Sequence, residues 1–426
     1  MKTRKTNFLL ASSLILFVGL FFSSCLEDQC SEERLFIEHI PVFLKAEEFR
    51  VQPVFAEERA MINTGKFYYY NDHIFINERY EGIHIIDNSD RENPVQSGFI
   101  ELPGNLDIAI RNDMLYADNY TDLLTIDISN LSQPTLICRQ ENVFENYWED
   151  EHLGYLVRYE PTQRTMSLDC SDPNFGDDIF IRNELVFIDV AFDGANGTPN
   201  VESGGSGTGG SMARFTLVND WLYVLTHQEL KAMMLSANDC PEQSASTYVS
   251  WGIETLFSYK EYLFIGANNG MYIYDASNPA TPEYVSEFRH AQACDPVFVK
   301  DDVAYVTLRD GTLCQNFINQ LDVIDISDIR QPELIKSYDM DHPHGLSVRD
   351  DHLYLCEGDH GLKVFDIKEL TEIDKNRVEH IKDIHAFDAI SLSSDHLLII
   401  GEAGLFQYDS SDPSNLKELS HISIQN

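Results

Sequence analysis

The sequence predicts an all-β protein, a β-propeller of about eight four-stranded blades, with seven blades as the alternative. The first observation is a repeated unit in which a short apolar strand ends in Asp and leads into a turn rich in Ser, Asn, Asp and Pro. The second is a two-residue hairpin sequence of the Asn-Asp type, which recurs before that strand. The third is that no segment keeps an apolar period of 3.6 residues, so helix should be minor. Repeated four-stranded sheets that close into a ring form a propeller.

Residues 1–24 are typical of a secretory signal peptide, with a basic start and an apolar run over Phe8–Phe22 that is short for a membrane span. The segment Phe22-Ser23-Ser24-Cys25 resembles the lipobox of bacterial lipoproteins, although Phe22 departs from the usual Leu. This resemblance implies that Cys25 is acylated, for example with palmitate, and that the protein is an outer-membrane lipoprotein of the cell envelope, on its periplasmic or its surface face. Ordinary cleavage near Ser24 is the alternative. We expect residues 25–60 to form a lipid-anchored tether.

The charge balance limits the partners of this protein. The chain has 30 Lys and Arg against 70 Asp and Glu, a formal net charge of −40. Nucleic-acid binding needs clustered cations, which are sparse here. Attachment to anionic lipids through basic residues is disfavoured for the same reason. We therefore expect no nucleic-acid partner and membrane contact only through the N-terminal lipid.

The repeats extend over residues 61–426, which we assign to the propeller. The clearest copies are Ile83–Asp90, Leu124–Asn130, Met271–Asn278 and Leu321–Asp328. The equivalent positions recur at 87, 127, 189, 235, 275, 325, 366 and 409, with a period near 40 and insertions. The third unit, at about 143–200, is long and degenerate, which is why seven blades remain the alternative. We interpret the Asp-Ser-Asn-Pro segments as turns capped by their own side chains, because none forms a twelve-residue calcium loop.

The segment Leu321-Asp322-Val323-Ile324-Asp325-Ile326-Ser327-Asp328 and its copies resemble the LVIVD-repeat proteins, β-propellers of bacterial and archaeal envelopes. The resemblance covers nearly all of residues 61–426. It implies a fold and a compartment. It implies no reaction and no catalytic residues.

Aligning the repeats places one polar residue at the start of the first strand in seven units. That strand normally lines the central channel of a propeller, so we expect these side chains to converge at one mouth of the channel. They are Lys66, Asp107, Arg214, Glu254, Asp295, His344 and Asp388. Clustered carboxylates bind cations or ligands and shift one another's pKa values. The other interpretation is structural, with neighbouring blades held together by pairs between basic residues and carboxylates.

Other candidate sites are less specific. Without Cys25 the chain has seven cysteines, so at least one stays unpaired; Cys294 and Cys314 lie in one repeat and are the first candidate pair. No cysteine and histidine spacing indicates zinc, and the metal content is unknown.

Four histidines lie close in sequence and are interpreted as loop residues: His342, His344, His352 and His360. Residues 204–210 are interpreted as a flexible glycine-rich loop, and the loop at 309–319 could contact a partner.

The expected function is a non-enzymatic binding or scaffold protein of the envelope, with an unknown envelope protein or glycan as its partner. We expect no cofactor, apart from the option of a cation in the channel. One alternative is a small-ligand or metal-binding protein that uses the channel ring. A second is a hydrolase or lyase that acts on an envelope polymer with paired carboxylates such as Glu254 and Asp295.

Overall fold

The repeated sequence unit folds into four consecutive antiparallel strands, in agreement with the predicted propeller blade. The computed structural model describes residues 31–144, 148–169, 208–211, 213–236, 240–289, 296–309 and 319–424. The blades lie in a compact unit made of residues 41–158 and 188–426, and a second unit comprises residues 1–40 and 159–187.

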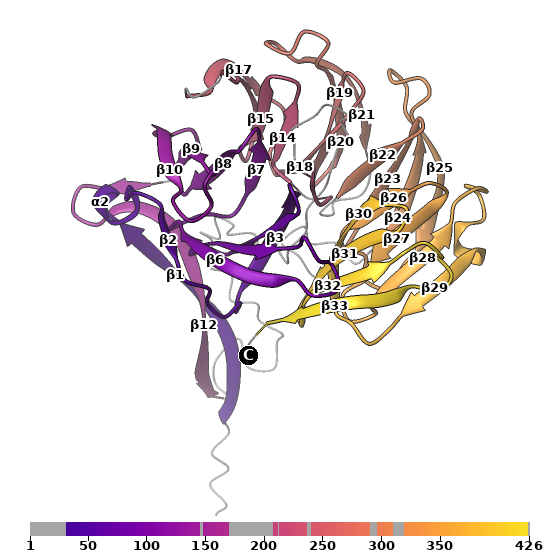
Figure 1. The fold of residues 1–426 in the computed structure, drawn as a ribbon, viewed down its shortest axis with the longest axis horizontal. Coiled ribbons are helices and arrows are strands. Elements are labelled where there is room, and N and C mark those ends of the chain that lie inside the picture. The colour runs from indigo at the N-terminus through magenta and orange to yellow at the C-terminus, as the bar shows by residue number, and fades with distance from the viewer. Residues whose placement is uncertain are drawn as a thin grey trace, which may run out of the picture. The chain divides into compact units, whose positions relative to one another are not determined.

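Seven complete four-stranded blades are present among the described residues, numbered here in chain order (Figure 1). Blade 1 contains β3 (Thr64–Tyr70), β4 (His73–Glu78), β5 (Gly82–Asp87) and β6 (Val95–Glu101). Blade 2 contains β7 (Ile108–Arg111), β8 (Met114–Asn119), β9 (Asp122–Asp127) and β10 (Thr135–Gln140). Blade 3 contains β14 (Phe215–Val218), β15 (Trp221–Leu225), β16 (Glu229–Met234) and β17 (Glu242–Tyr248). Blade 4 contains β18 (Ile253–Tyr259), β19 (Tyr262–Ala267), β20 (Gly270–Asp275) and β21 (Glu283–Arg289). Blade 5 contains β22 (Val297–Lys300), β23 (Val303–Leu308), β24 (Gln320–Asp325) and β25 (Glu333–Asp339). Blade 6 contains β26 (Leu346–Arg349), β27 (His352–Cys356), β28 (Leu362–Asp366) and β29 (Arg377–Ile381). Blade 7 contains β30 (Ala386–Ser393), β31 (His396–Gly401), β32 (Gly404–Asp409) and β33 (Lys417–Ser423).

The first strand of each blade is its innermost strand, as the propeller model requires. Successive innermost strands contact one another from β3 through β7, β14, β18, β22 and β26 to β30. The ring closes where Ile74 and Ile76 of blade 1 share a buried cluster with Leu398 and Ile400 of blade 7.

The sequence predicted eight blades, with seven as the alternative, and the number found depends on whether a three-stranded sheet is counted. The described residues form eight sheets, but one of these has three strands, β1 (Ser31–Leu44), β12 (Gly154–Asp169) and β11 (Glu149–Asp150). Its β11 and β12 come from the degenerate third unit. Because β7 and β14 are direct neighbours, the complete blades of the described chain number seven.

Part of the segment expected to be a tether is folded. Besides β1, it contains the short helix α2 (Ala46–Phe49) and β2 (Val54–Ala56), which pairs with the outer strand β6. The reason is apolar burial, since Phe49 is fully buried and its ring contacts Tyr120 and Tyr155. A 3₁₀ helix, η1 (Ile373–Lys375), is the other helical element described. No helix in the described ranges is long and apolar enough to cross a membrane.

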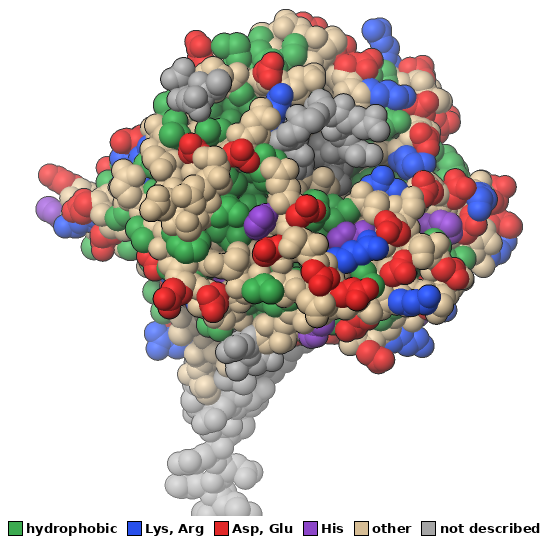
Figure 2. Space-filling model, in the orientation of Figure 1, with side chains coloured by type: hydrophobic (Ala, Val, Ile, Leu, Met, Phe, Trp, Pro, Cys, Tyr) green, Lys and Arg blue, Asp and Glu red, His purple; other side chains and the backbone are tan. Residues whose placement is uncertain are grey.

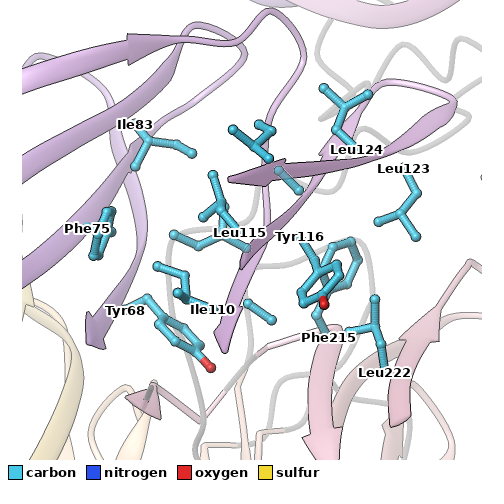
Figure 3. Packing of buried hydrophobic residues seen from close by; sticks show 14 of the residues in the cluster. Tyr68, Phe75, Ile83, Ile110, Leu115, Tyr116, Leu123, Leu124, Phe215 and Leu222 are labelled. Carbon is cyan, nitrogen blue, oxygen red and sulfur yellow. The ribbon is translucent and has the colours of Figure 1, made fainter. Parts of the chain in front are cut away.

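The core lies between blades. In the first of five buried clusters, side chains of blades 1, 2 and 3 interlock, among them Phe75, Ile110, Leu115, Phe215 and Leu222 (Figure 3). Alternating apolar residues on each strand face the two neighbouring blades. This packing fixes where each innermost strand begins, and therefore where the polar residue at its start lies.

Candidate functional site: the channel ring

Six of the seven predicted ring residues are described, and they lie at the start of their innermost strands. Lys66, Glu254 and Asp388 are within β3, β18 and β30. Asp107, Arg214 and His344 precede β7, β14 and β26 by one or two residues. All except the half-buried Arg214 are buried. Asp295 lies outside the described residues, so the proposed Glu254 and Asp295 pair is not assessed.

Four charges from three blades form one buried network. Lys66 Nζ lies 2.5 Å from Asp107 Oδ2, which also accepts a hydrogen bond from the backbone N–H of Arg214 at 2.7 Å. Arg214 Nη2 lies 2.8 Å from Asp118 Oδ2. Blade 2 supplies both carboxylates, and blades 1 and 3 supply one cation each. The network therefore joins three consecutive blades at the channel.

Asp118 was not predicted, although it is the most constrained member of this network. Its Oδ1 accepts hydrogen bonds from the backbone N–H groups of Leu106 and Asp107, at 2.7 and 2.9 Å, and from Asn105 Nδ2 at 2.9 Å. Burial raises the pKa of the Asp118 carboxyl, and the charge of Arg214 opposes that rise. Burial likewise lowers the pKa of Lys66, against the attraction of Asp107. A signal existed in the sequence, because the polar Asn77 of blade 1 occupies the equivalent position.

Glu254 is a ring residue whose carboxyl pKa is shifted toward neutrality. Glu254 is only 7% exposed, and this burial raises the pKa of its carboxyl to about 7. The positive charges of Arg309 and Lys66 act in the opposite direction and lower that pKa. A carboxyl whose pKa is raised in the folded state takes up a proton on folding between its ordinary pKa and about pH 7. Its contribution to stability therefore falls as the pH rises through that range. Glu254 is poised to gain or lose a proton near neutral pH.

His344 is held neutral by its surroundings. Burial lowers the pKa of the imidazole well below its usual range, and the charge of Arg309 lowers it further. The Arg309 guanidinium hydrogen bonds to His344 Nδ1, and His344 Nε2 lies 3.2 Å from His342 Nδ1. The same guanidinium nitrogen also lies 3.1 Å from His344 Nε2, and because a guanidinium can only donate, the His344 ring serves it as an acceptor. Arg309 directly follows β23 of blade 5. The sequence named it only as the first residue of the 309–319 loop, not as a partner of the ring.

Asp388 is bound by a segment that enters from the glycine-rich region. Ser211 Oγ donates to Asp388 Oδ1 at 3.1 Å and accepts the N–H of Leu346 at 2.9 Å. Just before it, β13 (Thr208–Gly209) pairs with β3 and contacts β30. The described end of this loop is therefore a short strand on the channel side of blade 1. Residues 204–207 lie outside the described residues.

Most of the charged side chains among the described ring residues and their neighbours are paired with one another. Lys66 and Arg214 form ion pairs with Asp107 and Asp118 across blade boundaries. Arg309 hydrogen bonds across another boundary to the neutral imidazole of His344. This geometry matches the structural interpretation of the ring, in which ion pairs hold neighbouring blades together. Glu254, with its pKa near neutrality, is the feature that fits a ligand or cation pocket better.

The remaining candidates have separate outcomes. Cys294 and Cys314 lie outside the described residues, so that pairing is not assessed. Among the described residues, Cys138 is joined to Cys240, with Cα atoms 5.3 Å apart, and Cys356 is a buried free thiol. The Asp residues that end the repeats cap their turns as predicted.

These caps share one geometry, a carboxylate Oδ1 that accepts the backbone N–H two residues on at 2.7–2.9 Å. The capping residues are Asp87, Asp127, Asp275, Asp325, Asp366 and Asp409. Of the four clustered histidines, His342 and His344 meet beside the ring. His352 begins β27 and pairs with Arg349, as expected for a residue at a hairpin.

Comparisons with known proteins give a family match and a fold. The LVIVD repeat model matches residues 106–141, 258–289 and 292–340. No curated relative matches the chain. The structure is similar to the computationally designed Ika8 protein, with a TM-score of 0.52 at 8% identity, over 87% of this chain and 91% of that one.

Two natural proteins are similar at a lower level. A functionally unknown protein from Desulfotomaculum acetoxidans gives a TM-score of 0.49 at 10% identity, over 85% of this chain and 97% of that one. Sqt1 of Saccharomyces cerevisiae gives 0.47 at 9% identity, over 90% and 86%. At these identities only the overall fold is compared.

Proposed function

We propose that this LVIVD-repeat β-propeller is a lipid-anchored protein of the bacterial envelope that binds a protein or glycan partner and catalyses no reaction. The observation that carries the proposal is the pairing inside the channel ring. Lys66 and Arg214 are engaged by Asp107 and Asp118 of the blade between them. Groups used in this way stabilise the propeller, which leaves the outer surface of the blades for a partner.

Two further observations support an exported binding protein. The Cys138–Cys240 disulfide is of a kind that persists in oxidising compartments such as the bacterial envelope. On the face shown in Figure 2, acidic side chains are scattered and basic side chains form no continuous patch, which supports a partner other than a nucleic acid.

The anchor is tested by replacing Cys25 with serine in the full-length protein. We expect the wild-type protein to incorporate a clickable palmitate analogue and to sediment with membranes. We expect Cys25→Ser to lose the label completely, because serine cannot form the thioether and the processed amino terminus that carry the lipids. A matched Cys30→Ser variant should keep the label. Equal labelling of Cys25→Ser and wild type would contradict the anchor.

A second candidate function is ligand or cation binding in the channel, favoured by the pKa of Glu254 near 7. Native mass spectrometry with elemental analysis separates it from the first. If the ring is a pocket, the wild type should carry a bound species that Glu254→Gln loses and the exposed control Glu261→Gln retains. If each of the three proteins gives only the mass of its own polypeptide, the pocket is contradicted and the outer surface is the place to map partners by cross-linking.

A further inference from the structure

Three chain segments are tied together at the boundary between blades 6 and 7. The backbone N–H of Gly358 donates to the carbonyl of Ala386 at 2.9 Å, and the reverse hydrogen bond measures 3.2 Å. The N–H of Glu402 donates to the carbonyl of His385 at 3.0 Å. These bonds place the β27–β28 turn, the start of β30 and the β31–β32 turn against one another. The side chains that follow are therefore positioned by the backbone.

Each of these segments contributes one metal-ligating side chain. His385 Nδ1 lies 2.9 Å from Asp359 Oδ1 and 2.7 Å from Glu402 Oε2. One ligand atom from each of the three residues falls within 4.8 Å of the others. His385 is half-buried, whereas both carboxylates are exposed and accessible to an ion from solvent. The set comes from both blades, so it is a feature of the folded propeller and of no single repeat.

The other edge of the His385 ring faces two more imidazoles. A methyl group on Gly358 would lie 3.3 Å from His385 Nε2, 3.2 Å from His342 Nδ1 and 2.9 Å from His344 Nε2. Three imidazole rings therefore surround this glycine, whose φ of +51° also disfavours a side chain. The result is a histidine-rich environment of the kind that suits zinc, copper and nickel.

We propose that Asp359, His385 and Glu402 bind a divalent transition-metal ion, with Zn²⁺ as the type case. Zinc takes histidine nitrogen and carboxylate oxygen in four-coordinate sites, so three protein ligands leave one position for water or a partner's side chain. The ion would bind at His385 Nδ1, the ring nitrogen that lies nearest both carboxylates. The other ring nitrogen, Nε2, is on the side of His342 and His344. The inference is independent of the proposed partner binding and uses none of the ring residues as ligands.

The test is isothermal titration of the full chain in detergent with Zn²⁺ after treatment with a chelator. We expect one equivalent to bind to the wild type and none to His385→Gln. Asp359→Asn and Glu402→Gln should each weaken binding by at least about tenfold, since even outer-shell changes at metal sites reach that size. Glu418→Gln removes an exposed carboxylate of the same blade and should bind as the wild type does. Metal-free unfolding curves of all variants establish that each one folds.

Two results would overturn the proposal. The first is the absence of stoichiometric Zn²⁺ binding by the folded wild type, which would leave the cluster as an ion pair of His385 with two carboxylates. The second is loss of binding in His342→Gln together with its retention in Glu402→Gln. That result would place the ion among the imidazoles around Gly358 and remove the carboxylates from the ligand set.

Discussion

Replacement of Arg214 by methionine is expected to lower the free energy of unfolding by about 3–5 kcal/mol, the range seen when one partner of a buried ion pair is removed. Asp118 is only 3% exposed and its carboxylate lies 2.8 Å from Arg214 Nη2. Without the guanidinium, the blade 2 carboxylates keep Lys66 as the remaining cation of the network. Chemical denaturation at pH 7.5 measures the difference.

The same variant should have a characteristic pH dependence. Burial already raises the pKa of Asp118 in the folded protein, and Arg214 opposes this rise. Loss of Arg214 therefore raises the pKa further. A raised carboxyl pKa destabilises the folded state increasingly as the pH rises, so the deficit should be larger at pH 8 than at pH 5. The double variant with Asp118→Asn should recover part of the loss, because the amide oxygen can still accept the three N–H donors.

Arg91→Met is the matched control for this prediction. Arg91 also bridges two blades, with Nη2 at 3.0 Å from Asp395 Oδ2, but the two side chains are 39% and 52% exposed. Exposed pairs contribute about 0–1 kcal/mol. A cost for Arg214→Met no greater than that for Arg91→Met would contradict a structural role of the ring network.

The features that the sequence predicted are those that recur in most of the repeats. Asn71, Asp72, Asn112 and Asp113 all have positive φ, between 47° and 60°, which is the conformation that two-residue hairpins between right-twisted strands require. Asn and Asp tolerate that conformation and appear at the same place in successive units. The ring positions were predictable for the same reason, since one alignment places them all at the innermost strand.

Contacts between repeats were not predictable in this way. Asp118 and Arg309 complete the ring, but each charge is supplied once, by one blade. The polar Asn77 at the position equivalent to Asp118 signals a buried polar contact, but it does not identify Arg214 as the partner. Asp359, His385 and Glu402 come from two blades and meet only because backbone hydrogen bonds join their loops. The degenerate third unit contributed strands to a separate sheet with β1, a pairing for which its internal pattern gave no register. The sequence repeat predicts the strands and turns within each blade, whereas these contacts depend on which side chains of neighbouring blades meet.

The Cys138–Cys240 disulfide is such a contact, and its removal should be the second large effect. The bond joins β10 at the outer edge of blade 2 to Cys240, which lies two residues before β17 of blade 3, across 102 positions of the sequence. Closing a loop of about 100 residues removes entropy from the unfolded chain equivalent to about 4.7 kcal/mol. We therefore expect Cys138→Ala to lower the free energy of unfolding by about 3–5 kcal/mol, most of it through the unfolded state.

Non-additivity distinguishes the lost bond from lost packing. Either single substitution already breaks the disulfide, so Cys138→Ala, Cys240→Ala and the double variant should be almost equally destabilised. Substitution is preferable to a reductant, which would act on every disulfide of the chain. Cys356→Ala, which removes a buried sulfur without breaking a bond, is the control for packing. Additive single effects, or a loss in Cys138→Ala no larger than in Cys356→Ala, would mean that packing between blades 2 and 3 holds this edge without the covalent link.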